Sequence, residues 1–289
     1  MSLSVAQWSG GEERVKPNIC RCWWRRRTRV AALCLMLVAC LLCGFDLPTP
    51  APVSLPFQEG EELTFEVSWL GMSVGAATLR VGKQIHTDGQ AVLPLLSLAH
   101  RHPFFSTFYE VDDRVESHLD LRQLLTRYYR IRLKEGSYRV HREVIFDPVQ
   151  QRATYSKNHQ PARLLPTGAA AQDPLSSLYV VRTLPLQVGA SVYLPIFDRG
   201  QTSLTEIQVV QRERLQLPFG TVNTLKLQPI LHTSGIFRRQ GALFIWLTDD
   251  ARRVPVQMLS RITIGSVTAR LLKVKGVELA NAGVEGKSH

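Results

Sequence analysis

The stretch Leu63-Thr64-Phe65-Glu66-Val67-Ser68-Trp69 decides the fold class of this chain. Its apolar residues alternate with polar residues, and this period of two is typical of a β-strand with one buried face. Leu70-Gly71-Met72-Ser73 predicts a turn, after which 74–81 returns as the partner strand. The pattern therefore predicts an antiparallel hairpin at the start of a β-rich domain.

The same alternation continues along the rest of the chain. Further strands are expected at 91–99, 104–119, 127–133, 138–146, 152–156, 191–197, 203–214, 221–231, 242–248, 254–262 and 266–274. A sheet of about a dozen strands must curl or close to limit its exposed edges. We therefore expect a mainly β fold, either a curved antiparallel sheet or a partly open barrel.

One short helix interrupts this pattern. Asp173 is a suitable N-cap, and Pro174 suits the first helical position. Apolar residues follow at helical spacing, and Pro185 ends the element. Because an amphipathic helix of about ten residues is marginal alone, we expect it to pack on the concave side of the sheet.

Residues 1–45 are expected to form a signal or anchor segment with an N-terminal extension. Arg25-Arg26-Arg27-Thr28-Arg29 precedes an uninterrupted apolar run over 30–45, which is typical of a secretory signal. Leu37-Val38-Ala39-Cys40 resembles the lipobox of bacterial lipoproteins, so Cys40 is a candidate for lipidation. A plain signal peptide or an uncleaved anchor is the alternative. The segment predicts export to the periplasm and leaves open whether the inner or the outer membrane is faced.

The remaining chain divides into three parts. A Pro-rich tether is expected at 46–57, a single β domain at 58–275 and a flexible tail at 276–289. All five cysteines lie before residue 45, so the domain contains no disulfide. The net charge of +11 owes much to the arginines of the signal, and it is weak support for nucleic-acid binding. We expect no nucleic-acid partner.

Several segments together resemble one family of exported Gram-negative proteins. They are 63–71, 111–117, 172–179, 217–221, 245–250 and 253–256. In this order they are similar to the domain-of-unknown-function family with the number thirty-one hundred and eight, over roughly residues 58–275. The resemblance implies an envelope-facing β domain with no established activity and no cofactor, and it assigns no catalytic residue.

No catalytic motif is found in the sequence. It has no G-x-S-x-G, no Walker A and no G-x-G-x-x-G motif. His100 and His102 are a close pair, but no neighbouring cysteine or carboxylate completes a zinc site, and we expect no metal. The candidate polar cluster for ligand binding comprises Asp113, Arg114, Glu116, Trp246, Asp249 and Arg253.

A basic hairpin is the other chemical feature. It carries Arg127, Arg130, Arg132, Arg139 and Arg142, with Tyr128, Tyr129 and Tyr138 between them. Such a surface suits anionic lipid head groups or a polyanion, and a solvated hairpin face is the alternative.

These features give three hypotheses for the function. The first is a non-enzymatic envelope protein whose curved sheet binds a lipid or another amphiphilic ligand. The second is a scaffold that recruits another envelope protein through a sheet edge or an apolar patch. The third is a glycan-processing hydrolase, which requires two carboxylates facing each other across a cleft.

Overall fold

The computed structural model describes residues 55–87, 89–101, 111–230 and 242–279. All of them lie in one compact unit, Ser54–His289. The predicted signal segment and the lipidation candidate Cys40 lie outside the described residues. The described strands are β1 (Glu62–Trp69), β2 (Met72–Val81), β3 (Ile85–Thr87), β4 (Gln90–Arg101), β5 (Asp112–Asp120), β6 (Thr126–Glu135), β7 (Tyr138–Asp147), β8 (Arg152–Lys157), β9 (Arg163–Pro166), β10 (Ser191–Asp198), β11 (Gln201–Leu217), β12 (Gly220–Ile230), β13 (Leu243–Thr248), β14 (Pro255–Arg261) and β15 (Ser266–Lys275).

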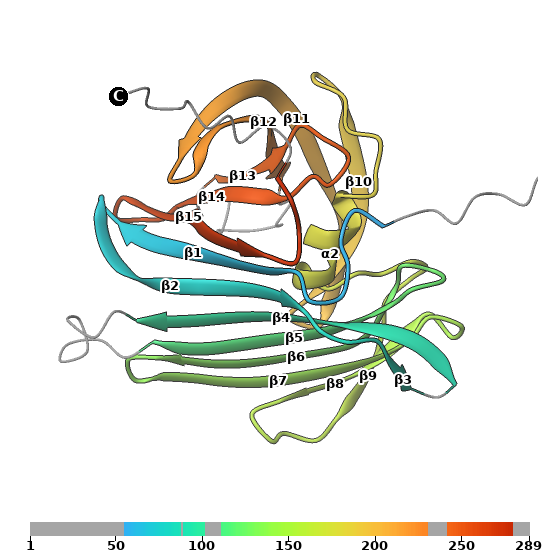
Figure 1. Cartoon of the computed structure of the whole chain (residues 1–289). Helices are drawn as coiled ribbons and strands as arrows, with labels where there is room; N and C mark the ends of the chain where they lie inside the picture. Colours follow the sequence, from blue (N-terminus) through green and yellow to red (C-terminus); the bar gives the residue numbers. More distant parts are fainter. Residues whose placement is uncertain (1–54, 88, 102–110, 231–241, 280–289) are drawn as a thin grey trace, which may run out of the picture. The chain divides into compact units, whose positions relative to one another are not determined.

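The strands form one antiparallel sheet (Figure 1). Its order is β10-β11-β12-β13-β14-β15-β1-β2-β4-β5-β6-β7-β8-β9, with β3 paired to β4 outside this path. Most sequence neighbours pair; in addition, β1 joins the last strand, β15, to β2, and β2 pairs with β4. The two ends of the order, β9 and β10, do not pair as strands, so the sheet is curved and not closed into a barrel.

The predicted fold class is confirmed, and the predicted number of strands is corrected from about a dozen to 15. The sequence did not reveal β3 and β9, which have three and four residues and almost no buried side chain. An exposed strand has no reason to alternate apolar and polar residues. The strand expected over 104–119 is described only from Asp112, because residues 102–110 lie outside the described ranges.

The helix α2 (Pro174–Val181) begins where the sequence predicted. Both oxygens of the Asp173 side chain accept hydrogen bonds, and Oδ1 binds the backbone N–H groups of Leu175 and Ser176. The Ser176 side chain reaches back to the backbone of Asp173, which completes a capping box. The helix is shorter than the ten residues expected, since the N–H of Thr183 bonds the carbonyl of Val180, three residues back, and tightens the last turn.

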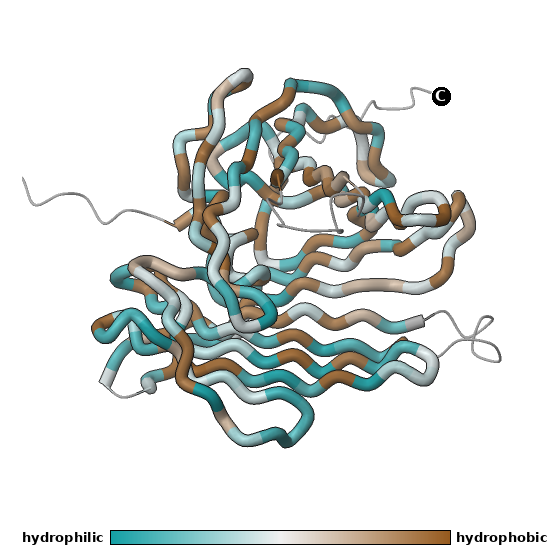
Figure 2. The backbone as a smooth tube through the Cα atoms, turned by 180° about the vertical axis from the view of Figure 1, so that it is seen from behind, coloured by the Kyte–Doolittle hydropathy of each residue, from teal (hydrophilic) through white to brown (hydrophobic). Residues whose placement is uncertain are grey.

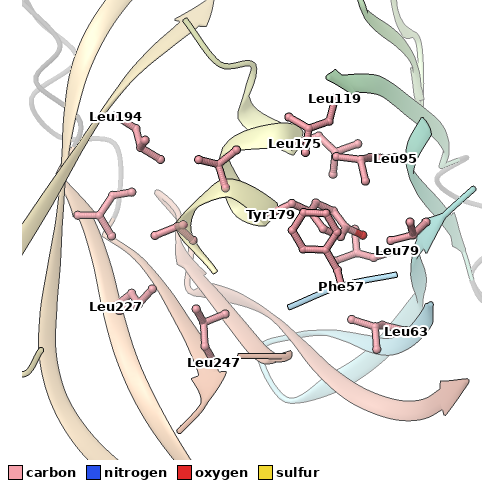
Figure 3. Packing of buried hydrophobic residues seen from close by; sticks show 14 of the residues in the cluster. Phe57, Leu63, Leu79, Leu95, Leu119, Leu175, Tyr179, Leu194, Leu227 and Leu247 are labelled. Carbon is pink, nitrogen blue, oxygen red and sulfur yellow. The ribbon is translucent and has the colours of Figure 1, made fainter. Parts of the chain in front are cut away.

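The core lies between α2 and the concave side of the sheet (Figure 3). Tyr179 of the helix packs edge-to-face on Phe57, with ring centroids 5.2 Å apart. Leucines approach from both halves of the sheet, among them Leu63, Leu79, Leu95 and Leu119 on one side and Leu194, Leu227 and Leu247 on the other. Apolar side chains from both halves of the sheet therefore pack around the helix.

Candidate functional site

The six residues of the predicted polar cluster lie in two separate groups. The first group is on β5, where Arg114 Nη2 lies 3.4 Å from Glu116 Oε2 and His118 Nε2 lies 3.1 Å from Glu116 Oε1. Burial acts to raise the pKa of Glu116, but the hydrogen bonds and charges of His118 and Arg114 outweigh it and lower the pKa. Asp113 accepts a hydrogen bond from the backbone N–H of Lys134, 2.9 Å away.

The second group surrounds the turn between β13 and β14. Trp246 donates its indole N–H to Glu213, and Asp249 pairs with Arg212 at 2.7 Å. Arg253 donates to backbone carbonyls that follow α2. Five strands separate β13 from β5 in the sheet, and no hydrogen bond or ion pair within the described ranges joins the two groups. Each of these side chains therefore has local partners, and the two groups do not converge on one ligand.

The basic hairpin of β6 and β7 is divided between the two faces of the sheet. Arg130 stacks over Tyr128, with its Cζ 5.1 Å from the ring centroid, and both bond the carboxylate of Glu143. Arg142 is buried on the opposite face and reaches Asp198 of β10 at 3.0 Å. Arg130 and Arg142 therefore have acidic partners on opposite faces, so the arginines of the hairpin do not all share one face of the sheet.

One pair of carboxyl groups lies close together, at the ends of β5 and β6. Burial raises the pKa of Glu135, and the charge of Asp113 and a hydrogen bond to it raise it further. The two groups are in hydrogen-bond contact, whereas a glycosidase needs its carboxyl groups about 5–9 Å apart to admit the substrate. This pair therefore lacks the geometry for glycan hydrolysis.

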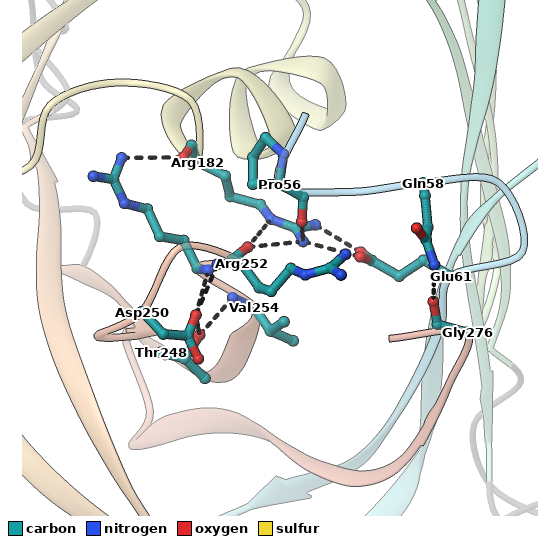
Figure 4. A network of polar contacts seen from close by, with 10 residues as sticks. Pro56, Gln58, Glu61, Arg182, Thr248, Asp250, Arg252, Val254 and Gly276 are labelled. Carbon is teal, nitrogen blue, oxygen red and sulfur yellow. Dashed lines mark hydrogen bonds and ion pairs between the residues drawn. The ribbon is translucent and has the colours of Figure 1, made fainter. Parts of the chain in front are cut away.

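A fully buried ion pair connects α2 to the start of the domain (Figure 4). Arg182 Nη1 and Glu61 Oε1 are 2.6 Å apart, with exposed fractions of 0 % and 1 % for the two side chains. The guanidinium also donates to the backbone carbonyls of Pro56 and Arg252. Because the pair is well matched and closed to solvent, it holds three segments together and offers no group to a ligand.

The clearest surface site is a groove beside the end of β15. The groove has a volume of about 690 Å³. Its lining residues are Phe219, Leu272, Lys273, Val274, Val277, Glu278 and Leu279. We call this set the β15 groove. Ligand pockets commonly have volumes of about 300–1,000 Å³, with mostly apolar walls and a few polar groups.

A β-bulge lies at Leu272, one of the apolar residues that line the groove. Phe65 of β1 pairs with Leu271 and Thr64 pairs with Lys273, so Leu272 is an extra residue without a partner in β1. It is 42 % exposed, although the neighbouring Leu271 is fully buried. Because of the bulge, Leu272 and Lys273 are consecutive exposed residues of β15.

A sharp turn after β15 builds the second wall. Gly276 has a φ of +75°, and a side chain at this position would clash with the backbone of Gly60. The side-chain amide of Gln58 donates to the carbonyl of Gly276 at 2.8 Å. Beyond the turn, Val277 and Leu279 pack against the core. The sequence analysis did not predict the groove, because it expected a flexible tail from residue 276. The apolar residues at 277 and 279 were the signal that this segment could pack against the domain.

A second hollow lies near the turn between β10 and β11. Its volume is about 160 Å³, and Tyr155, Lys157, Arg163, Leu165 and Arg199 are among its lining residues. It is smaller than a typical ligand pocket. The β15 groove is therefore the better candidate for an organic ligand.

The described residues offer neither a metal site nor a membrane-spanning helix. In the described ranges, no three His, Cys, Asp or Glu side chains are grouped so that they could hold a metal ion. Within these ranges, no helix combines the length and the hydrophobicity that crossing a bilayer requires.

Comparisons with known proteins give a family and several distant structures. A family model described as "Protein of unknown function (DUF3108)" matches residues 64–272. A β-barrel-like protein with domain of unknown function DUF1849 from Brucella abortus is 8 % identical, with a TM-score of 0.49 over 77 % of this chain and 98 % of that chain. No curated protein matches the chain.

Two further structures are similar at lower TM-scores. A protein from Bacteroides fragilis, described as exported and with a YmcC-like fold, is 10 % identical, with a TM-score of 0.33 over 76 % of this chain and 98 % of that chain. A protein from Parabacteroides distasonis, described as a lipoprotein, is 9 % identical, with a TM-score of 0.32 over 76 % of this chain and 97 % of that chain.

Proposed function

Since the chain belongs to the family described as "Protein of unknown function (DUF3108)", which names no activity, we propose a function from the geometry. The protein is a non-enzymatic component of the bacterial envelope that binds an amphiphilic ligand, such as a lipid, in the β15 groove. The observation that carries this proposal is the open groove itself, which has a volume of about 690 Å³ and a mixed lining of five apolar and two charged residues.

The lining of the groove suits a molecule with an apolar body and a polar head. Phe219, Leu272 and Val277 offer apolar contact, and burying a side chain of this kind contributes roughly 1.5–3 kcal/mol. Lys273 and Glu278 lie in the same lining, so a zwitterionic or charged head group has a partner of either sign. Apolar walls with few polar groups are typical of sites that hold small amphiphilic ligands.

The location follows from the N-terminal segment. Arginines followed by an apolar run support export to the periplasm. Lipidation of Cys40 would tether the domain to a membrane, where amphiphilic ligands are concentrated. We propose a periplasmic protein that is attached to a membrane through this segment.

The proposal gives no catalytic role to the close carboxyl pair or to the buried serine cluster. The carboxyl groups of Asp113 and Glu135 are too close to accommodate a substrate. Ser117, Thr126 and Ser176 surround the buried Asp173, and no histidine is among the hydrogen-bond partners of these four residues in the described ranges. A nucleophilic serine requires an adjacent base, so this cluster supports a helix cap and not a hydrolase.

Ligand-induced stabilisation tests the proposal. The exported chain, purified from a bacterial envelope, is heated with lysophosphatidylethanolamine below its micellar concentration. A bound ligand raises the unfolding temperature because it binds the folded state. The rise is expected for the wild type and for Leu164→Asp, which alters an exposed residue of β9. It is expected to be lost in Leu272→Asp, and an equal rise in both variants would contradict the β15 groove as the site.

A further inference from the structure

Two hairpin ends meet at one end of the sheet, and the β15 groove lies at the other end. The turn between β1 and β2 contacts the turn between β14 and β15, and both lie at the left of Figure 1. Trp69 donates its indole N–H to the carbonyl of Ile264 at 3.0 Å, and the N–H of Leu70 bonds the carbonyl of Ser266 at 3.3 Å. A side chain added at Gly265 would clash with Leu70, so the two turns are in close contact. The two turns therefore form one surface.

Large apolar side chains are exposed on both turns. The exposed fractions are 36 % for Trp69, 55 % for Leu70, 51 % for Met72, 46 % for Ile262 and 67 % for Ile264. We call these five residues the apolar tip. Figure 2 shows hydrophobic colours in these hairpin ends, at the right of that view. Single exposed apolar residues are ordinary, but a contiguous group of this size indicates a contact surface.

Three donors of the apolar tip already have acceptors within the protein. The Trp69 indole and the N–H of Leu70 have backbone acceptors, and the N–H of Ile262 bonds the carbonyl of Gly265 at 3.1 Å. An unpaired N–H costs several kcal/mol when it leaves water. Because these three donors are paired, they can enter an apolar medium without that cost.

The charge around the apolar tip is positive. Residues 67–80 and 260–270, which contain both turns, include no Asp and no Glu. Arg261 is exposed next to Ile262, and its guanidinium lies over the ring of Phe244 at 5.7 Å. Arg80 and Arg270 also belong to these stretches, but they have partners in Glu62 and in the carbonyl of Gln216. Among the described residues of these two stretches, Arg261 therefore supplies an exposed positive charge beside Ile262.

We propose that the apolar tip inserts into the interface of a bilayer that contains anionic phospholipid. Five side chains on two turns are too few for a stable protein interface, which needs roughly 20–30 residues on each side. Insertion into a bilayer needs only a few apolar side chains, and Trp and Arg are the residues that suit the boundary between head groups and acyl chains. This inference is independent of the groove, because the apolar tip lies at the start of β15 and the groove at its end.

Photo-cross-linking of the full chain tests the proposal. The variant Ile264→p-benzoylphenylalanine is inserted through its own N-terminal segment into vesicles of phosphatidylethanolamine and phosphatidylglycerol, and is then irradiated. The matched control carries the same substitution at Val149, which is 88 % exposed in the turn between β7 and β8, at the other end of the sheet. Mass spectrometry of the peptides identifies lipid adducts. Both positions are exposed, so neither substitution should disturb folding, and far-ultraviolet circular dichroism checks this.

A lipid adduct at position 264 and none at 149 is the expected result. Arg261→Gln is expected to lower the adduct yield about fivefold, because one basic residue strengthens binding to an anionic surface by about that factor. Replacing the vesicle lipids by phosphatidylcholine removes the anionic surface and is expected to have the same effect. Equal adducts at both positions would overturn the proposal, and so would the absence of an adduct at 264. The same variant irradiated in cells would overturn it if position 264 cross-linked to a protein and to no lipid. An unchanged yield for Arg261→Gln would contradict the role of anionic lipid.

Discussion

The guanidinium of Arg182 and the carboxylate of Glu61 form two hydrogen bonds, of 2.6 and 2.9 Å, across 121 residues of sequence. Both side chains are closed to solvent. Phe57 and Tyr179 flank the guanidinium, whose Cζ lies 5.3 and 5.4 Å from the two ring centroids. The pair thus fixes the segment before β1 against the end of α2. Loss of the pair should therefore destabilise the packing of the whole core.

Breaking this pair on one side is expected to destabilise the protein strongly. Arg182→Met leaves the Glu61 carboxylate buried without a cation, which costs about 3–5 kcal/mol. The double variant Glu61→Leu/Arg182→Met removes both charges and is expected to recover most of that loss. Urea unfolding of the single and double variants measures both free energies. A double variant no more stable than Arg182→Met would show that the pair's other hydrogen bonds dominate.

The cap of α2 gives a second prediction. Asp173 accepts hydrogen bonds from two backbone N–H groups and from the hydroxyls of Ser117 and Thr126, and it is fully buried. Asp173→Ala removes these acceptors and is expected to cost about 2 kcal/mol or more, because the donors are left unpaired. Asp173→Asn keeps one oxygen for the backbone, and the hydroxyls can accept from its amide, so its cost should be clearly smaller. Thermal unfolding of both variants checks this order.

The contributions of two carboxyl groups to stability should depend on pH in opposite directions. Burial and the charge of Asp113 raise the pKa of Glu135 in the folded state, so its stabilising contribution is present below the ordinary pKa and is lost as pH rises through the folded pKa. Glu135→Gln should therefore match the wild type at acidic pH and exceed it in stability at neutral pH. The effect is small, since the group is largely solvated.

Glu116 provides the control, because its pKa is shifted in the opposite direction. Although burial acts to raise its pKa, His118 and Arg114 lower it, so its contribution is present above the ordinary pKa and is lost as pH falls through the folded pKa. Glu116→Gln should be less stable than the wild type at neutral pH and equal to it at acidic pH. Urea midpoints across this pH range test both variants, and a shift of the same sign in the two would contradict the assignment.

The turn after β15 gives a fourth prediction. Gly276→Ala places a methyl group against the backbone of Gly60 at a φ of +75°, and neither backbone can yield without moving β1 or β15. We expect the free energy of unfolding to fall by about 1–3 kcal/mol or more. Ligand binding in the groove should also become weaker. Gly265→Ala is the matched control, because its φ of +78° is similar but the clash is with the flexible side chain of Leu70. Equal losses in the two variants would show that the clash with Gly60 does not matter.

The sequence predicted most of the fold because the alternation of burial is local information. Leu63 and Phe65 are fully buried and Glu66 is exposed, as the period of two requires. The cap at Asp173 was readable for the same reason, since its hydrogen bonds reach only two and three residues ahead. The exposed strand β9 left no such pattern and was missed.

The groove and the buried ion pair could not be predicted in this way. Nothing near Arg182 in the sequence indicates Glu61, 121 residues earlier. The groove depends on a bulge at Leu272, whose presence follows from how β15 pairs with β1 and not from its own neighbours. Sites that arise from contacts between distant segments require the structure.

The most direct test of the proposed function is native mass spectrometry of the exported chain purified from a bacterial envelope, followed by lipid extraction. The account predicts a co-purifying amphiphile in defined stoichiometry with the wild type and with the control Leu164→Asp. It predicts loss of this amphiphile in Leu272→Asp, whose charged side chain lies in the groove and should leave the unfolding temperature of the ligand-free protein nearly unchanged. A ligand-free mass for the wild type, or a ligand retained equally by Leu272→Asp, would contradict the proposal.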